Sequence, residues 1–87
     1  MHYVYLLKSE VKNKHYVGIA KNVKKRLLEH NAGKVRSTKP YIPYRCLYLE
    51  GYASVEDAKI REKRLKNFGK AYVQLKKRLK YSLQAWD

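Results

Sequence analysis

The chain has 87 residues, with 21 lysines and arginines against 7 aspartates and glutamates, and its formal net charge is +14. A chain of this length buries only roughly 60% of the surface that its unfolded form exposes, which excludes a second core and predicts one domain over 1–87. Hydrophobic residues make up 45% of the composition, which excludes a disordered tail. The strong positive charge predicts a negatively charged partner.

The expected compartment follows from the cysteine content and the N-terminus. Cys46 has no second cysteine with which to form an internal disulfide, and no cysteine and histidine spacing typical of a zinc site is present. The apolar run at the N-terminus ends at Lys8, which is too short for a signal peptide or a membrane span. We therefore expect a cytoplasmic protein that does not insert into membranes.

Three segments have the composition of strands. Residues 3–8 and 15–20 are aromatic, β-branched and aliphatic, and the polar stretch 9–14 separates them, which predicts an antiparallel hairpin. Residues 34–44 carry both prolines and show no period, so they are expected to form a surface loop. Residues 45–52 then form the third strand.

Helices are expected between and after these strands. The first spans about 22–32, from an N-capping Asn22 to a terminating Gly33. Its apolar stripe is Val23, Leu27 and Leu28. A capping box at Ser54 and Asp57 begins the second helix, and Gly69 separates it from a third. The predicted fold is α+β, a three-stranded antiparallel sheet flanked by helices in the order β-β-α-β-α-α.

One acidic residue in the second helix stands out against its surroundings. Between Lys59 and Lys80 there are ten basic residues and a single acid, Glu62. At helical spacing Glu62 shares the apolar face with Ala58 and Leu65. A buried carboxylate costs several kcal/mol unless it is paired or coordinates a cation. An ion pair with an arginine from another element and a metal-binding or catalytic role are both compatible with this pattern.

Polar residues of the first helix and the hairpin complement this carboxylate. Arg26 and His30 are four residues apart and lie on one face of the helix. Tyr5 and Tyr16 are expected to stand side by side on the hairpin, beneath a gap left by Gly18. Taken separately, these residues are also compatible with a solvated helix face, a histidine at a helix end and ordinary aromatic packing.

The order of these residues resembles the GIY-YIG nuclease superfamily. The two short motifs are similar to Tyr3-Val4-Tyr5 and Tyr16-Val17-Gly18, and the segments KNVKKRLLEH and EDAKIREKRLK also resemble the family. The similarity spans residues 3 to about 80. It is closest to short standalone bacterial proteins, which are similar to the N-terminal nuclease domain found in excinuclease ABC.

The resemblance implies a metal-dependent endonuclease that hydrolyses DNA phosphodiester bonds with low sequence specificity, in repair or recombination and on DNA that includes branched or damaged structures. Glu62 would bind one divalent metal ion, Mg²⁺ or Mn²⁺, and Arg26 would contact the scissile phosphate. Tyr5, Tyr16 and His30 would line the same site. Tyr5 would bind the phosphate or hold the attacking water, Tyr16 would be the general base or orient the water, and His30 would be the proton shuttle. Gly18 would be structural.

Further basic residues are expected to contact the DNA backbone. They are Lys21, Lys25, Arg36, Lys39, Lys66 and Lys76. Two sequence positions depart from the family pattern: Tyr3 replaces a glycine, and Ile19 stands where excinuclease domains tend to have lysine. Asn67 corresponds only loosely to an asparagine of some relatives.

Two other functions are compatible with the charge. A nucleic-acid-binding module without catalysis would use the basic residues and exposed tyrosines for backbone contacts and stacking. It leaves Glu62 on the apolar face unexplained. A cationic last helix anchored in a membrane surface by Trp86 is the third hypothesis.

Overall fold

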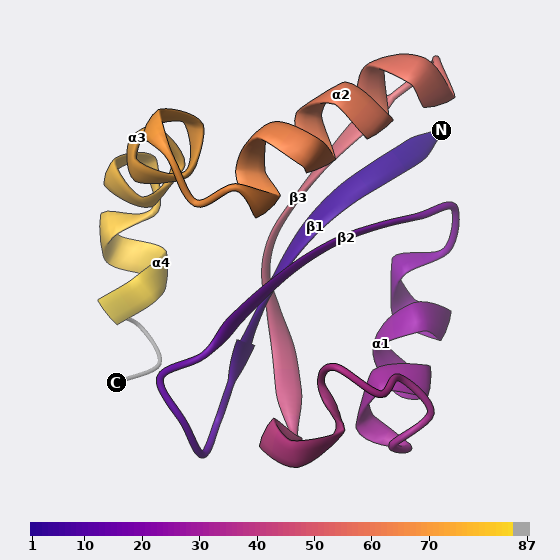
Figure 1. Ribbon diagram of the computed structural model, residues 1–87, viewed down its shortest axis with the longest axis vertical. Helices are drawn as coiled ribbons and strands as arrows, with labels where there is room; N and C mark the ends of the chain where they lie inside the picture. The colour runs from indigo at the N-terminus through magenta and orange to yellow at the C-terminus, as the bar shows by residue number, and fades with distance from the viewer. Residues whose placement is uncertain (85–87) are drawn as a thin grey trace.

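A computed structural model describes residues 1–84 (Figure 1). The strands are β1 (His2–Ser9), β2 (His15–Ala20) and β3 (Tyr44–Tyr52), and the helices are α1 (Val23–Asn31), α2 (Val55–Lys66), α3 (Lys70–Arg78) and α4 (Lys80–Gln84), with a 3-10 turn, η1, at Lys39–Tyr41. The predicted α+β class and element order are confirmed, and α4 is a short addition after α3. No helix within 1–84 combines the length and apolarity needed to cross a membrane. Trp86 lies outside the described residues.

The sheet has β1 at its centre. Its order is β2-β1-β3, and both pairings are antiparallel. The strands run between α1 on one side and α2 and α3 on the other (Figure 1). Because both faces of β1 are covered, its residues 4–7 are all buried, and the strand is a continuous apolar run rather than an alternating one.

The two faces of the sheet carry separate hydrophobic clusters. On the face covered by α2 and α3, here called the α2 face, the buried residues are Val4, Leu6, Val17, Ala58, Leu65, Tyr72, Leu75 and Leu79. On the opposite face, the α1 face, they are Tyr5, Leu7 and Tyr44, with Val23 and Leu27 of α1 packed against them. The alternation along β1 thus directs Tyr5 toward α1.

Leu28 is a correction to the predicted stripe of the first helix. Its side chain is 64% exposed, whereas His30 is completely buried. Val23, Leu27 and His30 follow at intervals of four and three residues, so they share one helix face that excludes Leu28. The helix face that packs against the sheet therefore carries the His30 imidazole, whereas the predicted stripe had Leu28 there.

The helix ends agree with the predictions only in part. Asn22 caps α1 as expected, its side chain accepting from the amide of Lys25 at 3.0 Å, and Gly33 adopts a φ of +76° beyond the end of the helix. The predicted capping box of α2 is wrong. The Ser54 hydroxyl donates to the Glu56 carboxylate at 2.9 Å, which draws it away from the backbone amides of the first turn.

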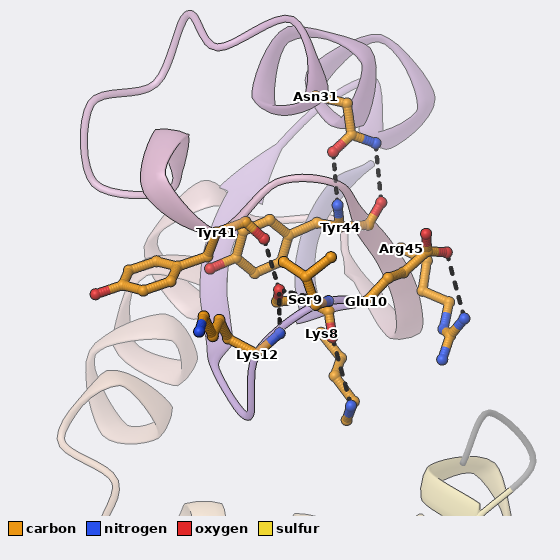
Figure 2. Close-up of polar contacts among 9 residues, drawn as sticks. Lys8, Ser9, Glu10, Lys12, Asn31, Tyr41, Tyr44 and Arg45 are labelled. Atoms are coloured by element: carbon orange, nitrogen blue, oxygen red, sulfur yellow. Dashed lines mark hydrogen bonds and ion pairs between the residues drawn. The ribbon is translucent and has the colours of Figure 1, made fainter.

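The loop 34–44 is tied to the rest of the fold at its C-terminal end (Figure 2). The Asn31 side chain donates to the Tyr44 carbonyl at 2.8 Å and accepts from the Tyr44 amide at 2.7 Å. The Ser9 hydroxyl donates to the Tyr41 carbonyl at 2.5 Å and accepts from two amides of the hairpin turn. These contacts join the loop to α1 and to the end of β1.

Asn31→Ala is expected to lower the free energy of unfolding by about 2 kcal/mol, because it removes both hydrogen bonds to the buried Tyr44 backbone. Urea denaturation followed by circular dichroism measures the change. Asn13→Ala, at an exposed position in the hairpin turn, is the matched control and should stay within about 0.5 kcal/mol of the wild type. Equal stability of the two variants would contradict this role for Asn31.

Candidate active site

Tyr5 and Gly18 are directly opposed on neighbouring strands. The Tyr5 side chain crosses the glycine, and a Cβ atom at position 18 would overlap the Tyr5 hydroxyl and lie 3.0 Å from the Tyr16 ring. The ring centroids of Tyr5 and Tyr16 are 6.3 Å apart. The expected gap at Gly18 therefore exists, and it is filled by the Tyr5 hydroxyl.

His30 lies in the last turn of α1 and completes a cluster with the two tyrosines. The Tyr5 hydroxyl and His30 Nε2 are 3.1 Å apart. The Tyr16 ring meets the imidazole edge-on, with centroids 4.8 Å apart. On its other side, His30 Nδ1 is 2.8 Å from Thr38 Oγ1. Both ring nitrogens thus have partners, and the imidazole is completely buried.

Burial also sets the protonation of this cluster. Burial, with a smaller contribution from the neighbouring Tyr16, raises the pKa of Tyr5 to about 12, and the Arg26 guanidinium opposes the shift. Burial lowers the pKa of His30, the positive charge of Arg26 acts in the same direction and Glu29 opposes it. At neutral pH the phenol of Tyr5 is therefore protonated and the imidazole of His30 is uncharged.

Arg26 lies one turn before His30 on the same helix face. Its guanidinium pairs with Glu29 at 3.2 Å, and the two side chains are 38% and 34% exposed. Such an exposed pair contributes at most about 1 kcal/mol, so a phosphate can replace the carboxylate at low cost. Because Arg26 is also close enough to lower the pKa of Tyr5, a phosphate bound there would lie beside the phenol.

Glu62 comes to this site from α2, which packs against the edge strand β2. Its side chain is 19% exposed and pairs with Lys66 at 3.6 Å. The Lys66 ammonium in turn lies 5.6 Å from the centroid of the Tyr16 ring. The negative charge of Glu62 also raises the pKa of Tyr5, after burial and Tyr16. The carboxylate therefore lies at the Tyr5 and Tyr16 edge of the cluster.

A second partly buried carboxylate, which sequence reasoning missed, lies on the α2 face. Glu50 of β3 accepts hydrogen bonds from the Tyr48 and Tyr52 hydroxyls at 2.5 and 2.9 Å and from Arg61 Nε at 2.5 Å. Its strand position opposite Val4 could have indicated an inward-facing acid. An ion pair between an acid and an arginine of another element was one explanation for Glu62. Such a pair exists, but its acid is Glu50 of β3, which pairs with Arg61 of α2.

The predicted backbone-binding residues are all exposed but do not form one surface around the site. Lys66 lies against Tyr16, whereas Lys76 of α3 lies over Tyr72, whose side chain belongs to the α2 face. Lys21 borders a separate cavity of about 370 Å³. Lys25 is on α1, and Arg36 and Lys39 are in the loop that contains Thr38.

The remaining notable positions lie outside the cluster. Tyr3 packs against Gly51 of β3, so its ring leans away from Tyr5. Ile19, at the position where excinuclease domains tend to have lysine, packs in the α2-face cluster. A lysine from another element, Lys66 of α2, lies beside the Tyr16 ring. Asn67 is an exposed residue at the end of α2.

Within 1–84, no three histidine, cysteine, aspartate or glutamate side chains come together to hold a metal ion. Glu62 is nevertheless a hard oxygen donor at the edge of the cluster. Mg²⁺ keeps most of its water molecules and needs only one or two carboxylates together with substrate oxygens. The site therefore fits a weakly held, hydrated divalent ion better than a preformed metal cage.

Comparison with known proteins places the chain in a family. The family model described as the GIY-YIG catalytic domain matches residues 1–77. The chain belongs to the GIY-YIG family. Among its relatives, a UPF0213 protein of Staphylococcus haemolyticus is 39% identical over 70 residues, covering 79% of this chain and 84% of the relative. One of Staphylococcus saprophyticus is 33% identical with the same coverage.

A solved structure agrees with this placement. The solution NMR structure of a UPF0213 protein from Bacillus halodurans is similar to this chain with a TM-score of 0.52 and 30% identity, covering 91% of this chain and 84% of that one. The resemblance to short standalone GIY-YIG proteins is therefore confirmed. The Bacillus protein shares the fold over most of its length.

Gly18→Ala is expected to displace the Tyr5 hydroxyl from His30 and to lower the free energy of unfolding by about 2 kcal/mol, since the added Cβ overlaps the Tyr5 side chain. Thermal and urea unfolding measure the loss. The control is Gly69→Ala, where an added Cβ meets no atom within 4 Å; because Gly69 is the N-cap of α3, it should cost less than about 1 kcal/mol. A neutral Gly18→Ala would show that Tyr5 does not need this space.

Proposed function

We propose that this GIY-YIG protein is a metal-dependent endonuclease that hydrolyses DNA phosphodiester bonds with low sequence specificity. The observation that carries the proposal is the convergence of Tyr5, Tyr16, His30, Arg26 and Glu62 from two strands and two helices, on a chain of net charge +14. Phosphodiester hydrolysis requires a proton acceptor, a cation for the phosphoryl oxygens and a positioned water. This cluster supplies side chains for all three.

The proton acceptor is the Tyr5 and His30 pair. The water gives its proton to the Tyr5 hydroxyl oxygen while the proton of Tyr5 passes to His30 Nε2, 3.1 Å away. The water oxygen forms a bond to phosphorus, and the bond from phosphorus to the leaving sugar oxygen breaks. Because the two transfers are coupled, Tyr5 need not ionise beforehand despite its raised pKa.

His30 accepts this proton only through Tyr5, because the buried imidazole cannot reach the leaving oxygen directly. Tyr16, whose ring contacts the imidazole edge, is assigned the orientation of the attacking water. The leaving oxygen then takes its proton from solvent. This assignment gives the base role to Tyr5, the tyrosine that is hydrogen-bonded to His30.

Positive charge at the phosphate comes from two residues. Arg26 presents a planar guanidinium that exchanges Glu29 for two phosphoryl oxygens. The Lys66 ammonium lies between Glu62 and Tyr16, where it can pair with a phosphate bound at the cluster. A divalent ion held by Glu62 would supply further positive charge for the phosphoryl and leaving oxygens.

Low specificity and the wider role also belong to the proposal. The exposed lysines and arginines are suited to backbone phosphates, which carry no sequence information. We assign the protein to repair or recombination in the cytoplasm, on DNA that includes branched or damaged structures. The alternative is a nucleic-acid-binding module without catalysis, favoured by Lys76 of α3, whose ammonium lies over Tyr72 of the α2 face rather than over a tyrosine of the cluster.

Cleavage of branched, single-stranded and duplex DNA in Mg²⁺ or Mn²⁺, with chelator as a blank, tests the activity. Glu62→Gln should lower the metal-dependent rate at least about 100-fold, since the ion contributes several kcal/mol to the transition state. Glu56→Gln, an exposed acid on the same helix, should cleave like the wild type. Metal-independent binding with no cleavage by the wild type would instead establish the binding module.

Arg26→Lys is expected to be nearly as damaging as Arg26→Ala, with a loss of about 100-fold in kcat, because an ammonium cannot replace the bidentate fork. Single-turnover cleavage separates this loss from weaker binding. Arg64→Lys, an exposed arginine on α2, keeps the charge and should retain the rate. Full activity of Arg26→Lys would remove the bidentate phosphate contact.

A further inference from the structure

Thr38 is buried within an otherwise exposed stretch of the loop 34–44. Its side chain is 1% exposed, whereas its neighbours Ser37 and Lys39 are both exposed. The threonine hydroxyl therefore lies inside the α1 side of the molecule, where it contacts His30 Nδ1 at 2.8 Å. Burying a hydroxyl is unfavourable unless it is hydrogen-bonded, so the hydrogen-bond partners of Thr38 indicate its role.

The direction of the hydrogen bonds around Thr38 can be deduced from its second partner. Thr38 Oγ1 donates to the Val35 carbonyl at 3.3 Å, and a carbonyl oxygen can only accept. A hydroxyl has one hydrogen, so when that hydrogen is directed at the Val35 carbonyl, Thr38 Oγ1 is left to accept from His30 Nδ1. In that arrangement Nδ1 of His30 carries the proton. A neutral imidazole has only one N–H group, and this leaves Nε2 with a free lone pair.

That lone pair faces the phenol of the catalytic pair. The Tyr5 hydroxyl lies 3.1 Å from His30 Nε2, and Tyr5 is protonated at neutral pH, so it donates this hydrogen bond. With the other tautomer, Nε2 would carry a hydrogen and could not take the proton of Tyr5. The direction of the relay thus depends on a hydroxyl that touches neither tyrosine nor phosphate.

We propose that Thr38 is a positioning residue, which holds His30 in the Nδ1-protonated tautomer and so keeps Nε2 available to accept the proton of Tyr5. Its effect on the tautomer stands on the geometry alone. Its effect on catalysis rests on the proposed nuclease function. The arrangement gives the basic loop a purpose besides phosphate binding.

The surroundings of His30 keep its imidazole uncharged. The groups that face it are Tyr5 from β1, Tyr16 from β2, and Arg26 and Glu29 from its own helix. Burial and the charge of Arg26 lower the pKa of the imidazole, and Glu29 opposes them. The relay is therefore open at neutral pH and closes in acid, when Nε2 becomes protonated.

The loop that carries Thr38 is also restrained. Ser9 holds the Tyr41 carbonyl three residues beyond Thr38, and Asn31, which follows His30 directly, holds both backbone groups of Tyr44 (Figure 2). Two sets of hydrogen bonds thus hold the C-terminal half of this loop: one joins Tyr44 to α1 next to His30, and the other joins Tyr41 to the end of β1. The restrained loop therefore keeps the Thr38 hydroxyl beside His30, as a positioning role requires.

The experiment compares Thr38→Val, which lacks the hydroxyl, with Thr38→Ser, which keeps it. The tautomer of His30 is read from ¹⁵N chemical shifts of the imidazole in protein without DNA or metal. We expect the Nδ1–H form in the wild type and in Thr38→Ser, and a shift toward the Nε2–H form in Thr38→Val. Ser37→Val, at the exposed neighbouring position, should match the wild type.

Cleavage assays follow the consequence. Thr38→Val should lose about tenfold or more in kcat with little change in KM and an altered pH profile, and Thr38→Ser should recover the rate. If Thr38→Val unfolds, the wild-type spectrum and Thr38→Ser still decide the question. An Nε2–H imidazole in the wild type, or an unchanged tautomer and pH profile in folded Thr38→Val, would overturn the proposal. An inactive wild type with the Nδ1–H form would refute the nuclease function and leave the tautomer assignment intact.

Discussion

The contact between Tyr5 and His30 is the interaction around which the candidate site is organised. It joins the central strand of the sheet to α1, and it requires that position 18 on the neighbouring strand have no side chain. Burial then acts in opposite directions on the two pKa values, which leaves both groups uncharged at neutral pH. An uncharged pair linked by one hydrogen bond can pass a proton without first burying a charge.

Glu50 and Glu62 are both partly buried carboxylates, but their partners differ. Glu50 receives three hydrogen bonds, one of them from a guanidinium, and these hold the pKa of its carboxyl low against the opposing effect of burial. Glu62 has a lysine four residues away on its own helix. Glu50 thus ties β3 to α2, whereas the partner of Glu62 is a half-exposed lysine on its own helix.

Local sequence patterns predicted most of the fold because they report local physics. The hairpin, the helix capped by Asn22 and the αL residue Gly33 each depend on a few neighbouring residues. The two errors involve side chains only two positions apart, between which the local pattern could not choose. Leu28 is displaced from the core by His30, and the Ser54 hydroxyl binds Glu56 rather than the helix backbone. Thr38 was missed because nothing in a basic loop indicates which hydroxyl turns inward.

Composition and local spacing were enough to predict the class of the fold, the excess of positive charge and the residue types for the proposed chemistry. These depend on composition and on spacing along one element. The packing of the helices on the sheet sets which side chains are hydrogen-bonded to His30: Tyr5 rather than Tyr16 at Nε2, and Thr38 at Nδ1. Hydrogen-bond direction between residues 25 positions apart depends on how strands and helices pack, which no local pattern encodes.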